Sequence, residues 1–412
     1  MSGEILFLAH RIPFPPDRGD KIRSHHVLKR LAQLAPVHVA TFADDDADAV
    51  EEAELASMAH SYCLVRRSTS LFLAGIQGLL RNEAVSLPAF YSEKLARYVE
   101  RVLAEHPVAT IYVFSGQMGQ YVPEHFAGRV IVDFCDVDSA KFEAYAARHS
   151  GPERWVHARE GRLLRREERR LALRADHCLL ISPEEAALFS ERLPSLERAA
   201  VSVGVLGNGI DSARFDPHSV APEPRLAALP PGRIVFTGQM DYPPNIDAVL
   251  RFAQRVLPRV RERLPQASFH VVGREPSEAV LALHGQGGCN VWGRVDDMRP
   301  WLAGSEIAVV PLEIARGVQN KVLEAMAMGL PVVLTSGAAT GIAAVDGKDF
   351  IVADSDAGLA AGVAELLRSP ARAEAVGEAA RRFVVEQQSW QAALAPLDRL
   401  LAAPARSVRH AA

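Results

Sequence analysis

Short apolar runs alternate with longer amphipathic stretches through both halves of the chain. The runs that predict buried strands are Glu4–Ala9, Val37–Phe42, Ile111–Phe114, Val130–Phe134, Cys178–Ile181, Arg233–Thr237, Ser268–Val272, Asn290–Trp292, Ile307–Pro311, Pro331–Thr335 and Asp349–Val352. Between them the apolar positions follow a helical period, as in the stretch from Lys21 to Leu34. Runs of Val, Ile and Leu without polar alternation are typical of parallel strands covered on both faces. The pattern therefore predicts an α/β protein with parallel sheets.

A proline-rich stretch separates the two series of strands. Residues 216–232 contain five prolines and little periodicity, and the alternation restarts at Arg233. A chain of 412 residues is also too long for one ordinary core, so two domains of roughly 200 residues are expected. We predict two doubly wound, Rossmann-like domains at residues 1–210 and 211–389, with residues 216–232 as the interdomain connection.

The most informative stretch is Gly317–Val333, which reads as a glycine loop, an apolar helix, a glycine C-cap at Gly329 and a buried strand. Its only charges are Lys321 and Glu324, three residues apart and therefore on one helix face. In one interpretation they pair with each other. In the other, the free N–H groups and positive dipole end of the helix hold a phosphate. Lys321 then adds a point charge, and Glu324 accepts hydrogen bonds from sugar hydroxyls.

Polar groups also follow predicted strands in the first half of the chain. After the first strand a proline-rich loop reaches Gly19, and Asp20 is the expected N-cap of the next helix. Such a loop presents N–H groups to an anion or substrate, and ordinary turn formation is the alternative. The segment Asp133–Lys141 carries acids and a lysine at a strand end, the edge where open α/β sheets bind ligands. It forms either part of an acceptor pocket or, through Asp138 or Ser139, a helix cap.

Charge and composition exclude several functional classes. The formal net charge is −4, so no strong basic field favours nucleic acid. No G-x-G-x-x-G follows the first strand of either half and no G-x-x-x-x-G-K-[ST] occurs, so hydride transfer and NTP hydrolysis lack support. The four cysteines form no CxxC pair, and no apolar run is long enough for a signal peptide or for a membrane span of about 18 residues. We expect a cytoplasmic protein.

The segment Arg154–Arg174 holds eight arginines interleaved with glutamates and leucines, which predicts a long helix. Most such charge runs form a solvated, salt-bridged face. The alternative is attraction to an anionic membrane surface, which is relevant if the acceptor is lipid-linked.

Several motifs resemble those of a known family. Asn208–Asp211 (Asn-Gly-Ile-Asp) and the string Lys321–Val333 resemble the signatures of GT-B glycosyltransferases of the family-4, or group 1, type. The string Ala315–Glu324, taken with Gly238–Asn245, is similar to the branch of bacterial sugar transferases associated with the PEP-CTERM/exosortase system and exopolysaccharide clusters. The likeness spans nearly the whole chain. Trp390 resembles the start of the tail that crosses back to the N-terminal domain in this family.

The resemblance implies a GT-B fold, in which an acceptor-side N-terminal domain faces a nucleotide-sugar donor domain across a cleft, and a C-terminal helix at residues 390–405 returns to the first domain. Lys321 would bind the donor diphosphate, and Glu324 the ribose. Backbone at Gly293–Val295 would bracket the base, and Gly19 would face the phosphates from the first domain. The implied donor-binding residues are Gly19, Gly238, Gln239, Asn245, Gly293, Arg294, Val295, Gly317, Val318, Gln319 and Asn320, and the implied catalytic residues are Lys321, Glu324 and Arg316.

The chain departs from the family pattern at three positions. Arg316 stands where the family usually has a glutamate, eight residues before Glu324, and Glu313 is the alternative for that role. The loop after Gly238 lacks the usual arginine, and Gln239 and Asn245 stand nearby. Ser115 follows the strand Ile111–Phe114 where many relatives have a histidine.

The resemblance implies transfer of a sugar from a UDP- or GDP-sugar to a polysaccharide or lipid-linked oligosaccharide in exopolysaccharide biosynthesis, with retention of the anomeric configuration. The nucleotide sugar is a substrate, and no cofactor is expected. No metal is expected either, because Asp44–Asp46 and Asp136–Asp138, which have D-x-D spacing, lie in the first half, away from the donor helix. The alternatives are a nucleotide-sugar 2-epimerase and, because of Arg316, a non-catalytic sugar-nucleotide sensor or scaffold. A peripheral contact with the inner face of the membrane would accompany a lipid-linked acceptor.

Overall fold

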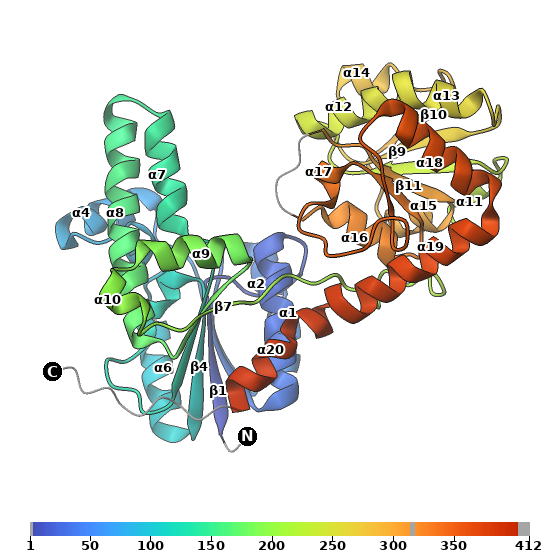
Figure 1. The fold of residues 1–412 in the computed structure, drawn as a ribbon. Helices are drawn as coiled ribbons and strands as arrows, with labels where there is room; N and C mark the ends of the chain where they lie inside the picture. The colour runs from blue at the N-terminus through green and yellow to red at the C-terminus, as the bar shows by residue number, and fades with distance from the viewer. Residues whose placement is uncertain (1–2, 314–317, 403–412) are drawn as a thin grey trace. The chain divides into compact units, whose positions relative to one another are not determined.

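The computed structural model describes residues 3–313 and 318–402 of the chain (Figure 1). These residues form two compact units. Unit 1 comprises the chain up to Asn208 together with the residues from Leu394 onward, and unit 2 comprises Gly209–Ala393. Each unit is built around a parallel sheet with helices, so the predicted pair of doubly wound α/β domains is confirmed.

In the described part of the chain, unit 1 holds a seven-stranded sheet with the order β3-β2-β1-β4-β5-β6-β7, and neighbouring strands are parallel. The strands are β1 (Glu4–Ala9), β2 (Val37–Ala43), β3 (Ser61–Arg66), β4 (Val108–Phe114), β5 (Arg129–Cys135), β6 (His177–Leu180) and β7 (Val203–Val205). The helices are α1 (Gly19–Leu34), α2 (Asp46–Val50), α3 (Glu52–Met58), α4 (Leu71–Arg81), α5 (Ser86–Ala89), α6 (Glu93–Glu105), the 3₁₀ helix η1 (Gly116–Tyr121), α7 (Asp138–Arg148), α8 (Gly151–Arg174), α9 (Pro183–Arg192) and α10 (Ser195–Arg198). The strand order reverses between β1 and β4, the position at which doubly wound sheets bind ligands.

Unit 2 holds a six-stranded parallel sheet in its described residues, with the order β10-β9-β8-β11-β12-β13. The strands are β8 (Arg233–Thr237), β9 (Ser268–Val272), β10 (Cys289–Gly293), β11 (Ile307–Val310), β12 (Val332–Leu334) and β13 (Ile351–Val352). The helices are α11 (Pro224–Ala227), α12 (Pro243–Arg251), the π-helical η2 (Phe252–Val256), α13 (Leu257–Arg261), α14 (Glu278–Leu281), α15 (Arg299–Ala303), α16 (Asn320–Ala327), α17 (Ser336–Ala339), α18 (Asp356–Arg368), α19 (Pro370–Phe383) and the π-helical η3 (Val384–Gln388). The order of this sheet reverses between β8 and β11.

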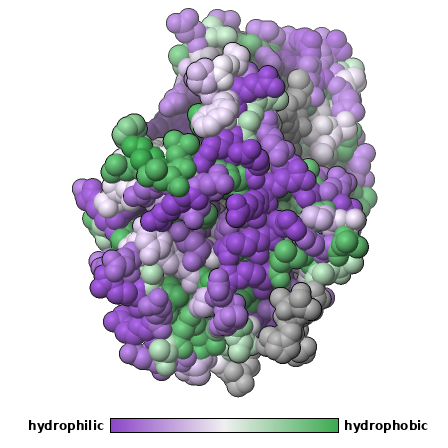
Figure 2. All heavy atoms as spheres, turned by 90° about the vertical axis from the view of Figure 1, so that its left-hand side faces the viewer, coloured by the Kyte–Doolittle hydropathy of each residue, from purple (hydrophilic) through white to green (hydrophobic). Residues whose placement is uncertain are grey.

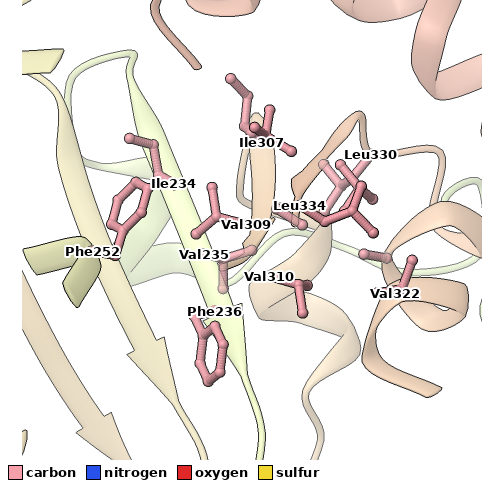
Figure 3. Close-up of a cluster of buried hydrophobic side chains, with 14 of the residues drawn as sticks. Ile234, Val235, Phe236, Phe252, Ile307, Val309, Val310, Val322, Leu330 and Leu334 are labelled. Carbon is pink, nitrogen blue, oxygen red and sulfur yellow. The ribbon is translucent and has the colours of Figure 1, made fainter. Parts of the chain in front are cut away.

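The core of unit 2 lies around these two central strands (Figure 3). Ile234 and Phe236 on β8, and Val309 on β11, are buried, as is Val322 on α16. Because helices cover both faces of the sheet, consecutive residues of a strand are apolar, and this explains the unbroken apolar runs in the sequence. The buried face of α16 packs this helix against β11 and β12.

Two strands that the apolar pattern did not predict, β3 and β7, form the two edges of the sheet of unit 1. Most of β3 is half-buried or exposed, and so is all of β7. An edge strand is covered less completely than a central one, so its sequence tolerates residues such as Ser61 and Gly204 that interrupt an apolar run.

Two local predictions are wrong. Helix α1 begins at Gly19, one residue before the expected N-cap Asp20, and the Asp20 carboxylate instead accepts a hydrogen bond of 2.6 Å from Arg11. Residues 216–232 belong to unit 2, and α11 within them buries Leu226 in its core. Proline content cannot distinguish a linker from a surface segment that one apolar side chain anchors.

Helix α20 (Trp390–Ala402) begins in unit 2, and its residues from Leu394 onward belong to unit 1. There Arg30 Nε donates to Asp398 Oδ1 at 3.0 Å, and Arg129 Nη1 donates to the carbonyl of Leu401 at 2.7 Å. The remaining residues of the predicted helix 390–405 lie outside the described ranges.

The residues of the Asn-Gly-Ile-Asp motif make contacts in both units, and these contacts explain the residue types. In unit 2, Gly209 lies so close to the backbone of Trp390 that a Cβ would stand 2.4 Å from the Trp390 nitrogen. The amide of Ile210 donates to the carbonyl of Gln388 at 2.7 Å, which continues the same contact. In unit 1, Asn208 Oδ1 accepts a hydrogen bond of 2.9 Å from Arg23.

Arg23 itself is buried on α1 and pairs with Asp133 at the end of β5, with Nη2 3.0 Å from Oδ1. Its guanidinium also donates to the carbonyl of Leu206, and Tyr112 donates to the same aspartate at 2.9 Å. A buried ion pair is tolerated when further hydrogen bonds satisfy both partners, as they do here. This network ties α1, β5 and the chain before Asn208 together.

Helix α4 exposes much of its apolar surface. Phe72 is 77% exposed and Leu80 is 83% exposed, and Leu73, Ile76 and Leu79 are also exposed. Figure 2, which faces the side of unit 1 that carries α4, shows hydrophobic side chains gathered among hydrophilic ones. Helix α8 lies beside it, with Arg159 Nη2 donating to the carbonyl of Gly78 at 2.7 Å. Across the described residues, no helix combines the length and apolar character needed to cross a bilayer.

Candidate functional site

The candidate site lies at the carboxyl ends of β8 and β11, where the strand order of unit 2 reverses. Helix α16 follows β11 and presents Lys321 and Glu324 there, while its opposite face buries Val322 and Met326 in the core. The helix ends where Gly329 adopts a φ of +70°, a conformation that glycine reaches without strain. The predicted helix, its glycine end and the following strand are confirmed.

Lys321 is held on two sides. Its Nζ donates a hydrogen bond of 2.5 Å to Oδ1 of Asn245, the third residue of α12, and lies 4.7 Å from the centroid of the Phe236 ring on β8. The amide of Asn245 is oriented in turn, because its Nδ2 donates to the carbonyl of Gln239 at 2.8 Å. The ammonium group is therefore positioned by one stretch of chain, from Phe236 to Asn245, which lies at least 76 positions before Lys321.

Gly238 forms the floor beside this ammonium group. It follows β8 with a φ of +155°, and its amide donates to the carbonyl of Val272 at 3.1 Å. A Cβ at this position would stand 3.0 Å from Asn245 Nδ2 and 3.1 Å from Lys321 Nζ. Any side chain here would occupy the space in front of Lys321, so the glycine keeps that space open.

Burial governs the charges of the site. It lowers the pKa of Lys321 to about 8, and the nearby Glu324 carboxylate opposes only part of that shift. Burial also raises the pKa of Glu324, against the opposing effects of Lys321 and Arg214. Neither Lys321 nor Glu324 has its charge fully compensated by its neighbours. The ammonium group of Lys321 is therefore placed to bind an anion.

Lys321 and Glu324 do not satisfy each other directly. No ion pair joins them among the residues that the structure describes, and the ammonium group is directed to Asn245 instead. The interpretation that these two charges simply pair is therefore wrong. Three residues on a helix place two side chains on one face, but the contacts each makes depend on the neighbouring helix.

Arg214 comes from the segment after the Asn-Gly-Ile-Asp motif. Asp211 shapes that segment, with its Oδ1 accepting from the amide of Arg214 at 3.0 Å and its carbonyl accepting from the amide of Phe215 at 2.9 Å. Arg214 acts electrostatically on Glu324. The motif therefore supplies a second positive charge to this region, which its resemblance to a known signature did not reveal.

Other predicted residues lie along the same edge of the sheet. Gly293 ends β10 with a φ of +70° and open space around its Cα, and Arg294 after it is exposed. Gln319 is the N-cap residue of α16, and Asn320 is its exposed first residue. Val318 is exposed beside Gly341, and Val295 packs partly against the core. Arg316 and Gly317 lie outside the described residues.

Glu313, the alternative to Arg316, is exposed after β11. Its Oε1 lies 3.7 Å from Arg251 Nε and 3.6 Å from Arg255 Nη2. The same arginines pair with Asp356, with Arg251 Nε 2.7 Å from Asp356 Oδ1. Glu313 is therefore the peripheral member of an existing charge network.

The corresponding edge of unit 1 carries Gly19 and Ser115. Gly19 starts α1 with open space around its Cα, and Ser115 follows β4 with a φ of +75°, which is unusual for serine. His10, which follows β1 at this edge, was not predicted as a site residue. Its ring stacks on Phe114 with centroids 5.9 Å apart, and its Nε2 lies 3.4 Å from Asp20 Oδ2. A histidine directly after the first buried strand was the available signal.

The segment Asp133–Lys141 does not cap its own helix as the alternative reading expected. Helix α7 starts after Val137, which provides no side-chain cap. Glu185 accepts from the amide of Val137 at 2.7 Å, and Glu168 accepts from the amide of Ser139 at 2.9 Å. Burial raises the pKa of Glu168 to about 7.

The region that contains this site is similar to known glycosyl transferases. The sequence profile of the family Glycosyl transferases group 1 matches residues 231–369, which include Gly238, Asn245, Lys321 and Glu324. A curated relative, glycogen synthase from Mycobacterium tuberculosis, is 27% identical over 256 residues. This alignment covers 60% of the present chain and 58% of the relative, so the chain spans little more than half of that protein.

Solved structures resemble nearly the whole chain. Sucrose-phosphate synthase from Thermosynechococcus elongatus aligns with a TM-score of 0.57 at 15% identity, covering 97% of this chain and 98% of that one. Anabaena Alr3699/HepE, crystallised in complex with UDP, aligns with a TM-score of 0.59 at 14% identity, covering 97% and 99%. WaaG, a glycosyltransferase involved in lipopolysaccharide biosynthesis, aligns with a TM-score of 0.55 at 16% identity, covering 97% and 100%. The chain therefore has the GT-B fold, and its residues 231–369 are similar to the family Glycosyl transferases group 1.

Proposed function

We propose that the protein is a glycosyltransferase that moves a sugar from a nucleotide-diphosphate sugar to a saccharide or lipid-linked acceptor. One observation carries the proposal: within the residues similar to group 1 glycosyl transferases, Asn245 and Phe236 hold the ammonium group of Lys321 above Gly238, at the reversal of the strand order. Unit 2 is the donor-binding domain in this proposal, and unit 1 is the acceptor-side domain.

The donor diphosphate would lie between Gly238 and the start of α16. Departure of the nucleotide diphosphate places negative charge on its terminal phosphate and positive charge on the anomeric carbon. Lys321 and the N–H groups at the helix start would stabilise the developing negative charge, which is worth more in a partly desolvated site than in water. Because Asn245 and Phe236 already hold the Lys321 side chain in place, little free energy is lost in ordering it when the donor binds.

Glu324 would accept hydrogen bonds from the ribose hydroxyls. Its burial raises the pKa of the carboxyl group, and in the described part of the chain it has no hydrogen-bond partner for its side chain. Backbone at Gly293–Val295 would bracket the base. A uridine nucleotide is the first choice, because HepE was crystallised with UDP and with UDP-glucose, and a guanosine nucleotide is the second.

The remaining features of the proposal are an exopolysaccharide pathway, retention of the anomeric configuration, metal-independent transfer and relationship to the PEP-CTERM/exosortase branch. They rest on the motifs Asn208–Asp211, Ala315–Glu324 and Gly238–Asn245. Arg316 or Glu313 would act near the transferred sugar, in place of the usual glutamate.

A lipid-linked acceptor would bring the protein to the inner face of a membrane. On unit 1, Trp155, Arg162 and Arg166 are exposed along one stripe of α8, and the exposed apolar residues of α4 lie beside that helix. Apolar side chains that enter the interface and arginines that attract anionic headgroups are the two elements of peripheral binding. This surface of α4 and α8 would therefore bind an anionic lipid bilayer.

Incubation of the purified full-length chain with a panel of UDP- and GDP-sugars tests the proposal. A donor should raise the melting temperature, because a ligand at about 100 times its Kd stabilises the folded state by about 2.7 kcal/mol. Sugar transfer to a saccharide acceptor is then expected, by chromatography and mass spectrometry. Formation of an epimer without acceptor would indicate the 2-epimerase. Binding without transfer or hydrolysis over a broad acceptor panel would indicate the sensor. The absence of any nucleotide-dependent shift would contradict all three.

A further inference from the structure

A cluster of metal-ligating side chains lies at the opposite edge of the sheet of unit 1, at the amino-terminal ends of its strands. Glu4 is the first residue of β1, His38 is the second residue of β2, and His106 lies between α6 and β4. Glu4 Oε2 is 2.6 Å from His38 Nε2 and 3.1 Å from His106 Nδ1. One potential ligand atom from each residue lies within 4.8 Å of the other two.

The sheet itself holds these groups together. Strand β1 pairs with β2, placing Ile5 beside Val37, and with β4, placing Glu4 beside Val108. The amide of Glu4 donates to the carbonyl of Pro107 at 2.9 Å, directly after His106. The backbones that carry the three ligands are therefore fixed by strand pairing, so the site needs little ordering when an ion binds.

The distances fit a small divalent ion with nitrogen and oxygen ligands. Zinc binds histidine nitrogen at about 2.0–2.1 Å and carboxylate oxygen at about 2.0–2.2 Å, which in a tetrahedron separates ligand atoms by about 3.3 Å. The two separations from Glu4 Oε2, 2.6 and 3.1 Å, are close to that value and need only a small outward movement. Two histidines and one carboxylate form a known zinc ligand set that leaves a fourth position for water.

The surroundings of His38 match those of a metal-bound histidine. Its Nδ1 lies 2.7 Å from Ser61 Oγ, which lies 2.7 Å from Tyr98 Oη. When Nδ1–H donates to Ser61, the lone pair of Nε2 is directed toward Glu4 and His106, and such an outer hydrogen bond orients histidine ligands. The His38 side chain is buried, whereas Glu4 and His106 are partly exposed, so an ion can enter from solvent.

A third histidine, His60, lies beside the cluster. His60 is exposed, and its ring centroid lies 5.3 Å from that of His38 and 6.1 Å from that of His106. Its amide donates to the carbonyl of Val37 at 2.8 Å, so the backbone position is fixed while the side chain can turn. Either this imidazole or a water molecule can complete four-coordination.

We propose that Glu4, His38 and His106 bind a divalent transition-metal ion of the zinc type. The ion would join the start of β1 to β2 and to the turn before β4, and would thereby stabilise unit 1. The site is independent of the donor residues and of the glycosyl transfer proposed above. A hydrogen-bonded carboxylate–histidine cluster that binds no ion is the competing account.

Calorimetric titration of the untagged, full-length, metal-stripped chain with Zn²⁺ tests this proposal, together with absorption spectra of the Co²⁺-loaded protein. We expect one ion per chain, a visible spectrum of four-coordinate cobalt and a raised melting temperature. His106→Ala and Glu4→Gln should each weaken binding by at least about tenfold, as loss of a direct ligand should cost no less than loss of an outer one. His218→Ala is the matched control, because His218 is an exposed histidine of unit 2.

Two results would overturn the proposal: no stoichiometric binding by the unaltered chain, or equal binding by the chain and both ligand variants. Circular dichroism verifies that the variants fold. If His106→Ala does not fold, Glu4→Gln decides alone, because the amide retains the size of the carboxylate. A donor-induced melting shift that persists in the variants separates this site from the proposed transferase site.

Discussion

The ammonium group of Lys321 donates a hydrogen bond to Oδ1 of Asn245, although the two residues lie 76 positions apart in the chain. One belongs to α16 and the other to α12, the helices that follow the two central strands of the sheet of unit 2. Because Asn245 also donates to the Gln239 carbonyl, its amide has one orientation and presents its oxygen to the lysine. This arrangement places a positive charge at the reversal of the strand order before any ligand is bound.

Replacement of this charge should abolish most activity. For Lys321→Ala we expect kcat/KM for glycosyl transfer to fall by at least about 10²-fold, the scale for losing a donor to a developing negative charge. Steady-state kinetics with saturating acceptor measures the effect. Lys348→Ala, at an exposed lysine of the same unit, should leave the rate unchanged. Near-normal turnover of Lys321→Ala would remove Lys321 from the mechanism.

Donor affinity should depend on pH through the same lysine. Burial lowers the pKa of Lys321 to about 8, so the site loses its positive charge as pH rises through that value. A bound diphosphate favours the protonated form and raises this pKa, and the ligand phosphate is already ionised above about pH 7. The affinity for UDP should therefore be constant from pH 7 to 8 and then fall by up to about tenfold per pH unit.

Calorimetry in buffers of different ionisation enthalpy should detect proton uptake on binding above pH 8. Lys321→Arg is the matched variant, since guanidinium remains charged throughout this range. It should remove the pH dependence even if it alters the affinity. An equal decline of affinity in this variant would assign the effect to another group.

A side chain at position 238 should block donor binding without unfolding the domain. In Gly238→Ala the Cβ would stand 3.0 Å from Asn245 and 3.1 Å from Lys321, and the backbone φ of +155° is one that alanine rarely adopts. We expect the UDP-induced rise in melting temperature to disappear. Gly75→Ala, at a helical position of α4 with open space around it, should keep the full rise. A normal UDP response of Gly238→Ala would show that the diphosphate binds elsewhere.

Binding to vesicles should depend on α4 and on the arginine stripe of α8. Arg162→Glu should reduce sedimentation with phosphatidylglycerol-containing vesicles by about fivefold or more, because one basic residue near an anionic surface contributes about 1 kcal/mol. Leu80→Glu should reduce it as well, because a carboxylate replaces an exposed apolar side chain that would enter the interface. Val345→Glu, at an exposed apolar residue of unit 2, is the control. Binding should weaken at high salt and be slight to phosphatidylcholine alone. Equal binding by all variants would exclude this face.

Much of the fold could be predicted because its signals are local. The interior strands β8 and β9 were predicted with their observed bounds, since burial on both faces makes each an unbroken apolar run. The edge strands β3 and β7 escaped prediction because partial exposure removes that signal. Residues 216–232 were misassigned because proline content reports chain stiffness and not the unit against which the chain packs.

The sequence by itself determined the two-domain α/β fold and the helix that carries Lys321 and Glu324. Hydrophobic periodicity, glycine position and charge spacing are properties of neighbouring residues, so they can be read along the chain. The tertiary structure alone decided that Lys321 contacts Asn245 and not Glu324, and that Glu4, His38 and His106 meet at one sheet edge. Such contacts depend on which strands pair and where the strand order reverses, and no short segment of sequence contains that information.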